Sequence, residues 1–534
     1  MISNINVAKD PWIPVLSQDG SLRIVNVEDA FFGNYKRVDG SNFMESFSIF
    51  KFLVTIMNGV VLPYWKELDA IDADEDMSYG ERNAKVFGFL KQILIKELPY
   101  YLDKWKDRFN MFDEKCPFLQ NANLQLANGA KPTDTLSFLS FDRASGNNPT
   151  FFDSAYKKPG HTYVPTSEEL VVKLLAHHNG HHHCGITSAV SANGFTYHNG
   201  NAKYSVCAGG ILHSFPIAET LLDSIILCFV NFSKIESNGM KVGRPVWELP
   251  VELIGNNKLS NVENATETFL GRMTPHGKMI RLFPDNTLVK GSTFLDPGIH
   301  HGKGLFTTDI TNYITVNKAV EKQTGYLKVG SMDTGSGLIY WMVSVYDGEK
   351  SNNDFRGPLW LNNLHNVDDV SMCAGALCSD QGKFISLREF FFTNIKHLVS
   401  KEIEYQKAVG DFQKVSKITD EVERELCSAV YMFNKGTSTK KISASATSLK
   451  ESAATYYRNN IDAEMSILLQ TVSNTHSQVY VDLADLLFRV SVSAFKTYCV
   501  KPYVDASKYY EFLSGFETIA KEKLSFLYNG GEVK

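Results

Sequence analysis

The residues with the clearest potential for chemistry form a histidine-rich segment that ends in a cysteine. From His177 to Cys184 the chain reads His-His-Asn-Gly-His-His-His-Cys. Imidazole and thiolate are the usual ligands of zinc, so a metal-dependent hydrolase centred on this segment is one hypothesis. The available second donors lack the regular spacing of zinc motifs: Cys207, His213, His300 and His301. A polar loop that follows a helix explains the segment better, and we predict neither a metal site nor a cofactor.

The sequence patterns of other enzyme classes are missing. The chain has no P-loop pattern, no nucleophile elbow and no His-Glu-x-x-His motif. Its grouped acidic residues, Asp368–Asp369 and 72–76, fall in polar stretches where a solvated surface is expected. We therefore predict a protein that is not an enzyme.

Two segments have a composition that suits contact with nucleic acid. The loop over 143–152 joins a cation, small polar residues and paired aromatics: Arg143, Asn147, Asn148, Phe151 and Phe152. Such a loop can approach a phosphate backbone through its amides and stack rings on bases, although an ordinary surface loop has the same features. The second segment is a basic connection between helices that includes Lys440 and Lys441 and could touch phosphate.

The overall charge limits how the chain could hold DNA. A net charge of −5 over 534 residues is unusual for a protein that binds DNA by its own charge, because phosphate neutralisation supplies most non-specific affinity. DNA contact would thus need local cations within a larger assembly. Eight scattered cysteines without a C-x-x-C pair indicate reduced thiols, and no signal pattern or membrane span is evident. We expect a cytoplasmic protein without membrane contact.

Hydrophobic periodicity predicts the elements that must position these residues. A strand–turn–strand hairpin is expected over 9–29, with helices over 43–62 and 81–97. Thr166-x-x-Glu169 is a capping box, which predicts a helix running to about Ala176 and a loop from 177 onward. Short strands and glycine-rich turns then form the rest of a mixed α/β part.

The character of the chain changes near residue 385. A further capping box, Ser386-x-x-Glu389, and apolar residues at helical spacing predict a helix to about Val399. Three or four helices follow, one of them beginning at a capping box at Ser448. Helices with one apolar face each must bury those faces against one another. We predict an α+β fold, with a large mixed N-terminal domain over 1–383 and a C-terminal four-helix bundle over 384–534.

At several points, in the correct order, the sequence resembles the CasA family, the large subunit of the type I-E CRISPR Cascade complex. The opening Asp10-Pro-Trp-Ile-Pro-Val15 is similar to that of the family, and Cys116-Pro-Phe-Leu-Gln120 lies at its P-F-[LM]-Q position. Ala208-Gly-Gly210, Pro245-Val-Trp247 and Ala454-x-x-Tyr457 follow in the expected order. The resemblance covers essentially the whole chain.

The resemblance implies a subunit that binds double-stranded DNA without cutting it. CasA-like subunits read the short PAM element from the minor groove, open the duplex to start R-loop formation and recruit a helicase–nuclease. Their partners are the other Cascade subunits, the crRNA and the target DNA. This division of labour is physically sensible because guide pairing reads the sequence while the protein reads a short duplex feature. A purely architectural subunit without base contact is the alternative.

The family's PAM-reading elements can be assigned residue by residue. Its glutamine wedge, on a hairpin before the bundle, resembles Asp380-Gln381-Gly382, where Gln381 would split the first base pair. Lys290, which precedes a Pro/His-containing segment, resembles the lysine finger. The glycine loop has no glycine run here, so Gly180, Gly185 and Gly194 compete for it, and the PAM sequence stays open.

Two further functions follow from the same resemblance. The loop over 143–152 takes the place of the family's loop that contacts the crRNA and neighbouring subunits. Lys440 and Lys441 of the bundle would face a displaced DNA strand. The family's cysteine-rich metal cluster has no counterpart in this sequence.

Overall fold

The computed structural model describes the following parts of the chain. They are residues 2–140, 163–180, 188–192, 195–197, 210–237, 239–249, 264–265, 267–276, 278–291, 310–317, 322–329, 353–366, 370–380, 383–392, 395, 403–435, 440–464, 477–499 and 506–531.

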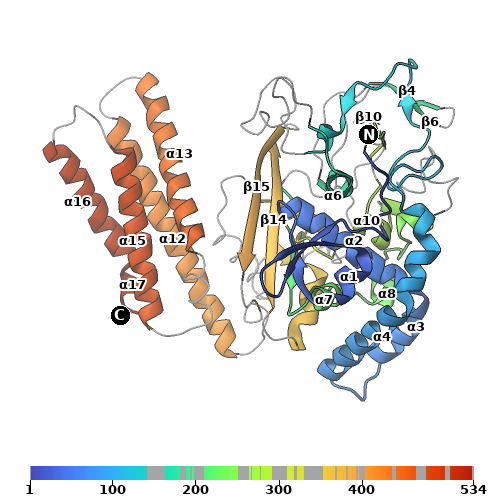
Figure 1. The fold of residues 1–534 in the computed structure, drawn as a ribbon. Coiled ribbons are helices and arrows are strands. Elements are labelled where there is room, and N and C mark those ends of the chain that lie inside the picture. Colours follow the sequence, from blue (N-terminus) through green and yellow to red (C-terminus); the bar gives the residue numbers. More distant parts are fainter. Residues whose placement is uncertain are drawn as a thin grey trace. The chain divides into compact units, whose positions relative to one another are not determined.

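The chain divides into two compact units. The first comprises Met1–Ser331 and Asn352–Asn394 and mixes helices with small sheets, whereas the C-terminal helices belong to the second. Figure 1 shows both units as ribbons. The predicted α+β fold class, a mixed N-terminal part followed by C-terminal helices, is confirmed.

The described strands form small antiparallel sheets of three strands each. In spatial order these sheets are β2 (Leu22–Val25), β1 (Ile13–Ser17) and β3 (Tyr35–Val38); β5 (Asp134–Thr135), β10 (Thr287–Lys290) and β9 (Ile280–Leu282); β12 (Lys322–Tyr326), β11 (Ile314–Asn317) and β13 (Asn353–Arg356); β15 (Lys383–Phe392), β14 (Ser371–Asp380) and β8 (His213–Ile217); β4 (Gln125–Leu126), β6 (Val190–Ala192) and β7 (Phe195–Tyr197). The predicted hairpin over 9–29 is confirmed by the pairing of β1 with β2.

Helices pack with these sheets in the first unit and make up the described elements of the second. The first unit contains α1 (Val27–Phe32), α2 (Phe43–Val61), α3 (Trp65–Asp72), α4 (Tyr79–Trp105), α6 (Ser167–Gly180), α7 (Leu221–Leu227), α8 (Phe232–Ser237), α10 (Phe269–Met273) and the short 3-10 turn η3 (Leu136–Leu139). The second contains α12 (Ile403–Lys435), α13 (Lys440–Ala463), α15 (Ser477–Tyr498), α16 (Ala506–Lys523) and α17 (Ser525–Tyr528).

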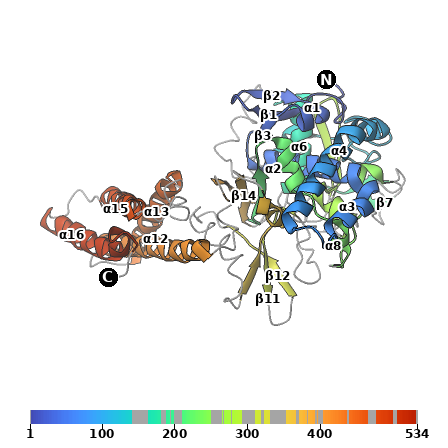
Figure 2. The ribbon, with the colours of Figure 1, turned by 90° about the horizontal axis from the view of Figure 1, so that it is seen from below.

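Helix α2 is the centre of the first unit. Asn42 caps its start by accepting a hydrogen bond from the Glu45 amide, and every residue of the helix is buried. It contacts α4, α6, α7, α10 and strand β14, which lie around it in Figures 1 and 2. The stretch 43–72 is long and apolar enough to cross a membrane, but 89% of its most apolar window is buried inside the protein. It is therefore built as a core helix.

The second unit is a bundle in which α12 packs against α13, α15 and α16. Its core contains Leu426, Val430, Leu487 and Phe495, all buried. The amphipathic spacing predicted these faces correctly. The start of one helix was predicted wrongly. Helix α13 begins at Lys440, so Ser448 lies inside this helix and not at its N-terminus.

The predicted helix after Ser386 is wrong, because this segment is strand β15. It pairs with β14 from Met372↔Phe392 to Asp380↔Lys383, with one register shift between Cys378 and Ser379. Its apolar residues fit helical spacing and a strand buried on one face equally well, and short apolar runs do not separate the two. The pairing with β14, the strand that directly precedes it, decides in favour of the strand.

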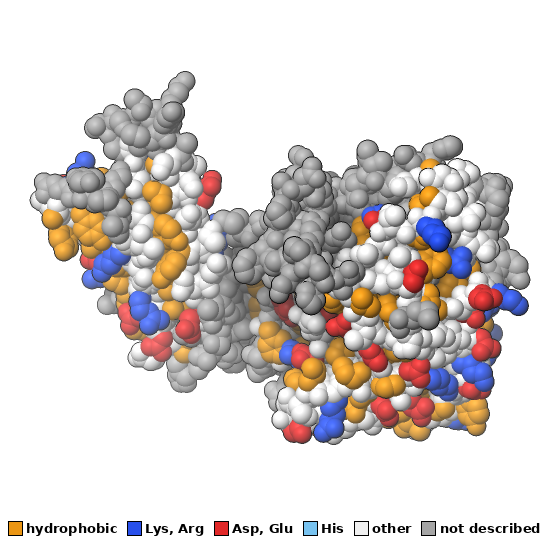
Figure 3. All heavy atoms as spheres, turned by 45° about the horizontal axis from the view of Figure 1, so that its top comes forward, with side chains coloured by type: hydrophobic (Ala, Val, Ile, Leu, Met, Phe, Trp, Pro, Cys, Tyr) orange, Lys and Arg blue, Asp and Glu red, His pale blue; other side chains and the backbone are white. Residues whose placement is uncertain are grey.

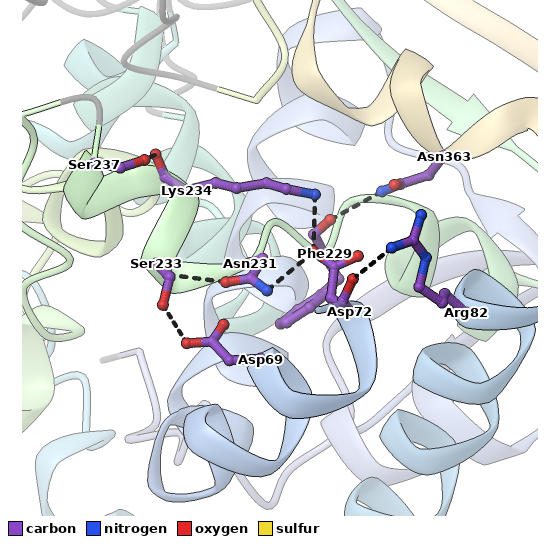
Figure 4. A network of polar contacts seen from close by, with 9 residues as sticks. All are labelled: Asp69, Asp72, Arg82, Phe229, Asn231, Ser233, Lys234, Ser237 and Asn363. Carbon is purple, nitrogen blue, oxygen red and sulfur yellow. Dashed lines mark hydrogen bonds and ion pairs between the residues drawn. The ribbon is translucent and has the colours of Figure 1, made fainter. Parts of the chain in front are cut away.

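A polar network joins the α3–α4 hairpin to the segment that carries α8 (Figure 4). The Asp72 carboxylate accepts from Asn231 Nδ2 at 3.2 Å and pairs with Lys234 Nζ at 2.9 Å, and its side chain is 18% exposed. Arg82 donates to the backbone carbonyl of Asp72 at 3.2 Å, and Ser233 donates to the Asp69 carboxylate. Polar contacts thus fasten a helical hairpin that has few buried residues on α3.

We predict that Asp72→Ala lowers the free energy of unfolding by about 1–2 kcal/mol, because it removes a mostly buried carboxylate and leaves the Asn231 amide and the Lys234 ammonium without this acceptor. Denaturant unfolding followed by circular dichroism measures this value. Glu75→Ala, which removes an exposed carboxylate from the following loop, is the control and should change it by less than about 0.5 kcal/mol. Equal effects of both substitutions would contradict the role given to the network.

Candidate nucleic-acid interface

The predicted hairpin before the C-terminal helices is present. Asp380 ends β14 and is paired with Lys383, the first residue of β15, so the two residues between them in the sequence are Gln381 and Gly382. Both lie outside the described residues. A Gln-Gly connection between paired strands agrees with hairpin chemistry, in which a glycine serves in a two-residue turn.

The base of this hairpin is fixed against the core helix α2. Strand β8 pairs with β14 from Ser371 to Gly375 and completes the sheet. At Gly375 a Cβ atom would lie 2.5 Å from the ring of Phe43 and 2.7 Å from the backbone oxygen of Arg388. Only glycine allows the strand to approach the helix this closely. The hairpin therefore starts from the most deeply buried part of the first unit.

Lys290, the predicted lysine finger, ends β10 and has partners within the protein. Its Nζ atom lies 3.4 Å from the Asp134 carboxylate and 3.6 Å from the centroid of the Phe138 ring, and the side chain is 20% exposed. Asp134 and Phe138 were not foreseen as neighbours, since they come from β5 and η3, far earlier in the sequence. No local pattern could have indicated them. A phosphate or base acceptor would have to compete with Asp134 for this ammonium group.

The loop predicted from 177 onward is wrong for its first four residues, which extend α6 to Gly180. The Thr166–Glu169 capping box begins this helix as predicted: the Glu169 amide donates to Thr166 Oγ1 at 3.2 Å, and the Thr166 amide donates to the Glu169 carboxylate at 3.0 Å. The residues from His177 to Gly180 are buried. A Cβ atom on Gly180 would lie 2.2 Å from Met44 Cε of α2. Gly180 is therefore a packing residue of α6, not part of a glycine loop.

His178, at the buried end of α6, packs against His276, and burial keeps both imidazoles neutral at physiological pH. The rings of His178 and His276 are 5.2 Å apart at their centroids, and the His178 Nε2 atom is 2.8 Å from the Leu119 carbonyl oxygen. Burial, and secondarily the neighbouring His276, lowers the pKa of His178 well below its usual value. Burial alone lowers the pKa of His276 to about 4. Polar residues at the end of α6 are thus accommodated in the interior, which explains why a polar pattern misled the loop prediction.

The metal hypothesis and several predicted contacts concern residues that the structure does not describe. Among the described residues no group of three or more His, Cys, Asp or Glu side chains could hold a metal ion. The remaining predicted residues outside the described ranges are Gly185, Gly194, Arg143, Asn147, Asn148, Phe151, Phe152 and the segment from His181 to Cys184.

Lys440 and Lys441 belong to the first turn of α13, so the flexible basic connection predicted to contain them is shorter than expected. On the face in Figure 3, basic and acidic side chains of the first unit are interspersed, and no single basic stripe crosses the part of that face that the structure describes. This agrees with the net charge of −5. Any contact with DNA or RNA on this face would rely on individual cations.

The architecture is that of a recognised class of two-part proteins. Solved structures with the same fold include CasA of Thermus thermophilus (TM-score 0.65, 14% identity, 98% of this chain and 99% of that chain covered) and CRISPR-associated protein Cse1 of Acidimicrobium ferrooxidans (TM-score 0.64, 13% identity, 99% of each covered). A chain in a structure described as a CRISPR RNA-guided surveillance complex matches with a TM-score of 0.65 at 14% identity, covering 97% of this chain and 99% of that one.

The sequence itself assigns the family. Residues 6–490 match the family model for CRISPR-associated protein Cse1, and the chain belongs to this family. The resemblance to CasA is thereby confirmed. A curated relative, CRISPR-associated protein CasA/Cse1 of Thermus thermophilus, is 26% identical over 259 residues, which are 48% of this chain and 44% of that protein. The sequence match thus spans less than half of the relative's length.

We predict that stability falls as the pH drops from about 6.5 towards 4. Below its usual pKa of 6.5, His276 takes up a proton in the unfolded chain, whereas the folded chain takes it up only near pH 4. At pH 5 this single group costs about 2 kcal/mol of folding free energy. Denaturant unfolding at pH 7.5 and 5.0 measures the loss.

His276→Gln, which cannot take up this proton, should lose about 2 kcal/mol less than the wild type between the two pH values. The comparison is made within each protein across pH, so a general effect of the substitution cancels. An identical loss in both proteins would contradict the assignment to His276.

Proposed function

We propose that this chain is the large subunit of a type I-E CRISPR Cascade complex, in which it recognises the PAM from the minor groove and opens target double-stranded DNA. The proposal depends on one observation above all: a member of the Cse1 family carries a Gln-Gly connection at the end of an anchored hairpin, directly before its C-terminal helices. In this proposal the crRNA and the other Cascade subunits hold the target together with this chain. Cutting is left to a recruited helicase–nuclease.

The proposed wedge action is physically plausible for such a hairpin. Inserting a side chain between base pairs costs a few kcal/mol of stacking energy, which subsequent pairing with the guide recovers. Gln381 can also hydrogen-bond to the base edges that it separates. The side chain must be presented on a support that does not yield, and the contact of the hairpin base with α2 favours this.

The charge of the chain is compatible with this role if other subunits supply most phosphate contacts. A net charge of −5 gives little non-specific affinity by itself. Binding in the minor groove needs only a few well-placed donors, because that groove presents a degenerate pattern of acceptors. Lys290 is the proposed donor in the first unit, and Lys440 and Lys441 are proposed to contact the displaced strand.

We predict that Gln381→Ala slows R-loop formation on duplex DNA by about tenfold or more, equivalent to about 1.4 kcal/mol or more in the barrier. The rate is measured with reconstituted complex and a duplex that carries the PAM, identified beforehand from a randomised library. Binding to single-stranded target should be unchanged because no base pair has to be opened. Gln125→Ala, at an exposed glutamine of β4, is the control.

Equal rates for Gln381→Ala and wild type on the duplex would sink the wedge assignment. Wild-type binding that does not depend on the PAM sequence would instead favour the architectural subunit without base contact.

We predict that Lys290→Ala weakens PAM-dependent duplex binding by about tenfold, as expected for the loss of one good donor at about 1–2 kcal/mol. Asp134→Asn removes the ion-pair partner but leaves the lysine, and should keep or strengthen binding. Binding constants are compared on duplexes with the PAM and with an altered PAM. If both substitutions weaken binding equally, Lys290 acts through its ion pair and not through DNA.

A further inference from the structure

Among the described residues, the outer half of the hairpin has no further strand paired along the free edge of β14. Strand β8 pairs with β14 only from Ser371 to Gly375, whereas the pairing of β14 with β15 continues to Asp380↔Lys383. Beyond Gly375, β14 and β15 would form an isolated two-stranded ribbon, and such ribbons are marginally stable in water. The end of the hairpin therefore needs another attachment if it is to be held in place.

Gly210 and Val329 provide an attachment along the open edge of β14. The Gly210 amide donates to the Leu377 carbonyl at 2.9 Å, and the Val329 amide donates to the Gly210 carbonyl at 2.7 Å. The Cys378 thiol donates to the Val329 carbonyl at 3.3 Å. These three contacts, which we call the edge clamp, connect β14 to Gly210 and to Val329, and connect these two residues to each other. They act about 14 Å of strand before residue 381.

The edge clamp requires glycine at position 210. The residue has a φ angle of +79°, which residues with a side chain rarely adopt, and a Cβ atom would lie 2.5 Å from the Val329 carbonyl oxygen. That oxygen is backbone and accepts the Cys378 bond, so it cannot move aside without breaking the clamp. The register shift between Cys378 and Ser379 begins directly after the clamp and adds a local bend to the strands.

We propose that the edge clamp positions the tip of the hairpin for opening the duplex, which makes Gly210 a positioning residue for the wedge. This inference rests on the proposed function of Gln381. A side chain that separates a base pair is pushed back by the closing duplex, and a loosely held tip yields before the base pair does. Small displacements of a reacting or inserting group are known to cost large factors in rate.

The test uses Gly210→Ala in the full chain, assembled with the guide RNA and the other subunits. Two DNA targets carry 2-aminopurine next to the PAM: a fully paired duplex, and the same DNA with the first base pairs mismatched. We expect opening of the duplex to be slowed on the order of tenfold. On the mismatched DNA, which needs no wedge, the rate should return to within about twofold of wild type.

Gly239→Ala is the matched control. Gly239 has a φ angle of +77°, so an alanine there meets the same backbone strain, but no atom lies within 4 Å of its Cβ position. The complex with Gly239→Ala should open both DNA targets at the wild-type rate. General damage to the fold would slow both targets alike, whereas loss of positioning slows the paired duplex alone.

Wild-type opening of the duplex by Gly210→Ala, or an equal slowing on both targets, would overturn the inference. Gln381→Ala in the same assay separates the two proposals. If Gln381→Ala opens the duplex at the wild-type rate, the proposed function fails. If Gln381→Ala is slow but Gly210→Ala is not, only the positioning role of Gly210 fails. Should Gly210→Ala not assemble, Cys378→Ala removes a single contact of the clamp. It should slow the duplex by about two- to threefold with the same recovery on mismatched DNA, and wild-type speed would contradict the clamp.

Discussion

The first unit depends on the complete burial of helix α2. A helix without a solvent-facing side has to be covered all round, and the surrounding elements are arranged to do so. The polar residues inside it are accommodated locally: Thr55 donates to the Lys51 carbonyl at 2.8 Å, and Asn58 donates to the Val54 carbonyl at 2.8 Å. The Lys51 ammonium donates to the Arg272 carbonyl at 3.3 Å. The core helix thus holds its neighbours by apolar packing and, at Lys51, by a hydrogen bond to the backbone of α10.

Two glycines allow neighbouring elements to pack closely against α2. Gly180 of α6 lies against Met44, and Gly375 of β14 lies against Phe43, so two elements that lead outward are seated on the first turn of the same helix. The hairpin and the end of α6 consequently share one support. The buried histidines at the end of α6 belong to the same region, which couples their protonation to the packing of the first unit.

The sequence predicted several elements from local signals, although the equally local capping boxes at Ser386 and Ser448 start no helix. The capping box at Thr166, the hairpin at Asp19–Gly20 and the apolar faces of the C-terminal helices all depend on residues within a few positions of one another. The errors arose where strand pairing or a tertiary contact decides the structure. The segment after Ser386 is a strand because β14 pairs with it. His178 can be buried because its Nε2 atom lies within hydrogen-bond distance of the Leu119 carbonyl oxygen. For the candidate interface, family motifs indicated the hairpin, whereas the Asp134 and Phe138 partners of Lys290 and the attachment at Gly210 have no signature in the local sequence.

The paired strands β14 and β15 limit how this part of the chain can evolve. Side chains alternate between the two faces of a strand, so a residue inserted or deleted between Ser371 and Phe392 would exchange the faces of everything beyond it unless a bulge absorbs the change, as the register shift between Cys378 and Ser379 does. Most single substitutions leave the pairing intact, because backbone groups make it. The hairpin is therefore free to diverge in composition, while its geometry limits changes in its length. Homologues that differ at most positions should still align here without gaps, and gaps should gather in the connections outside the ladder.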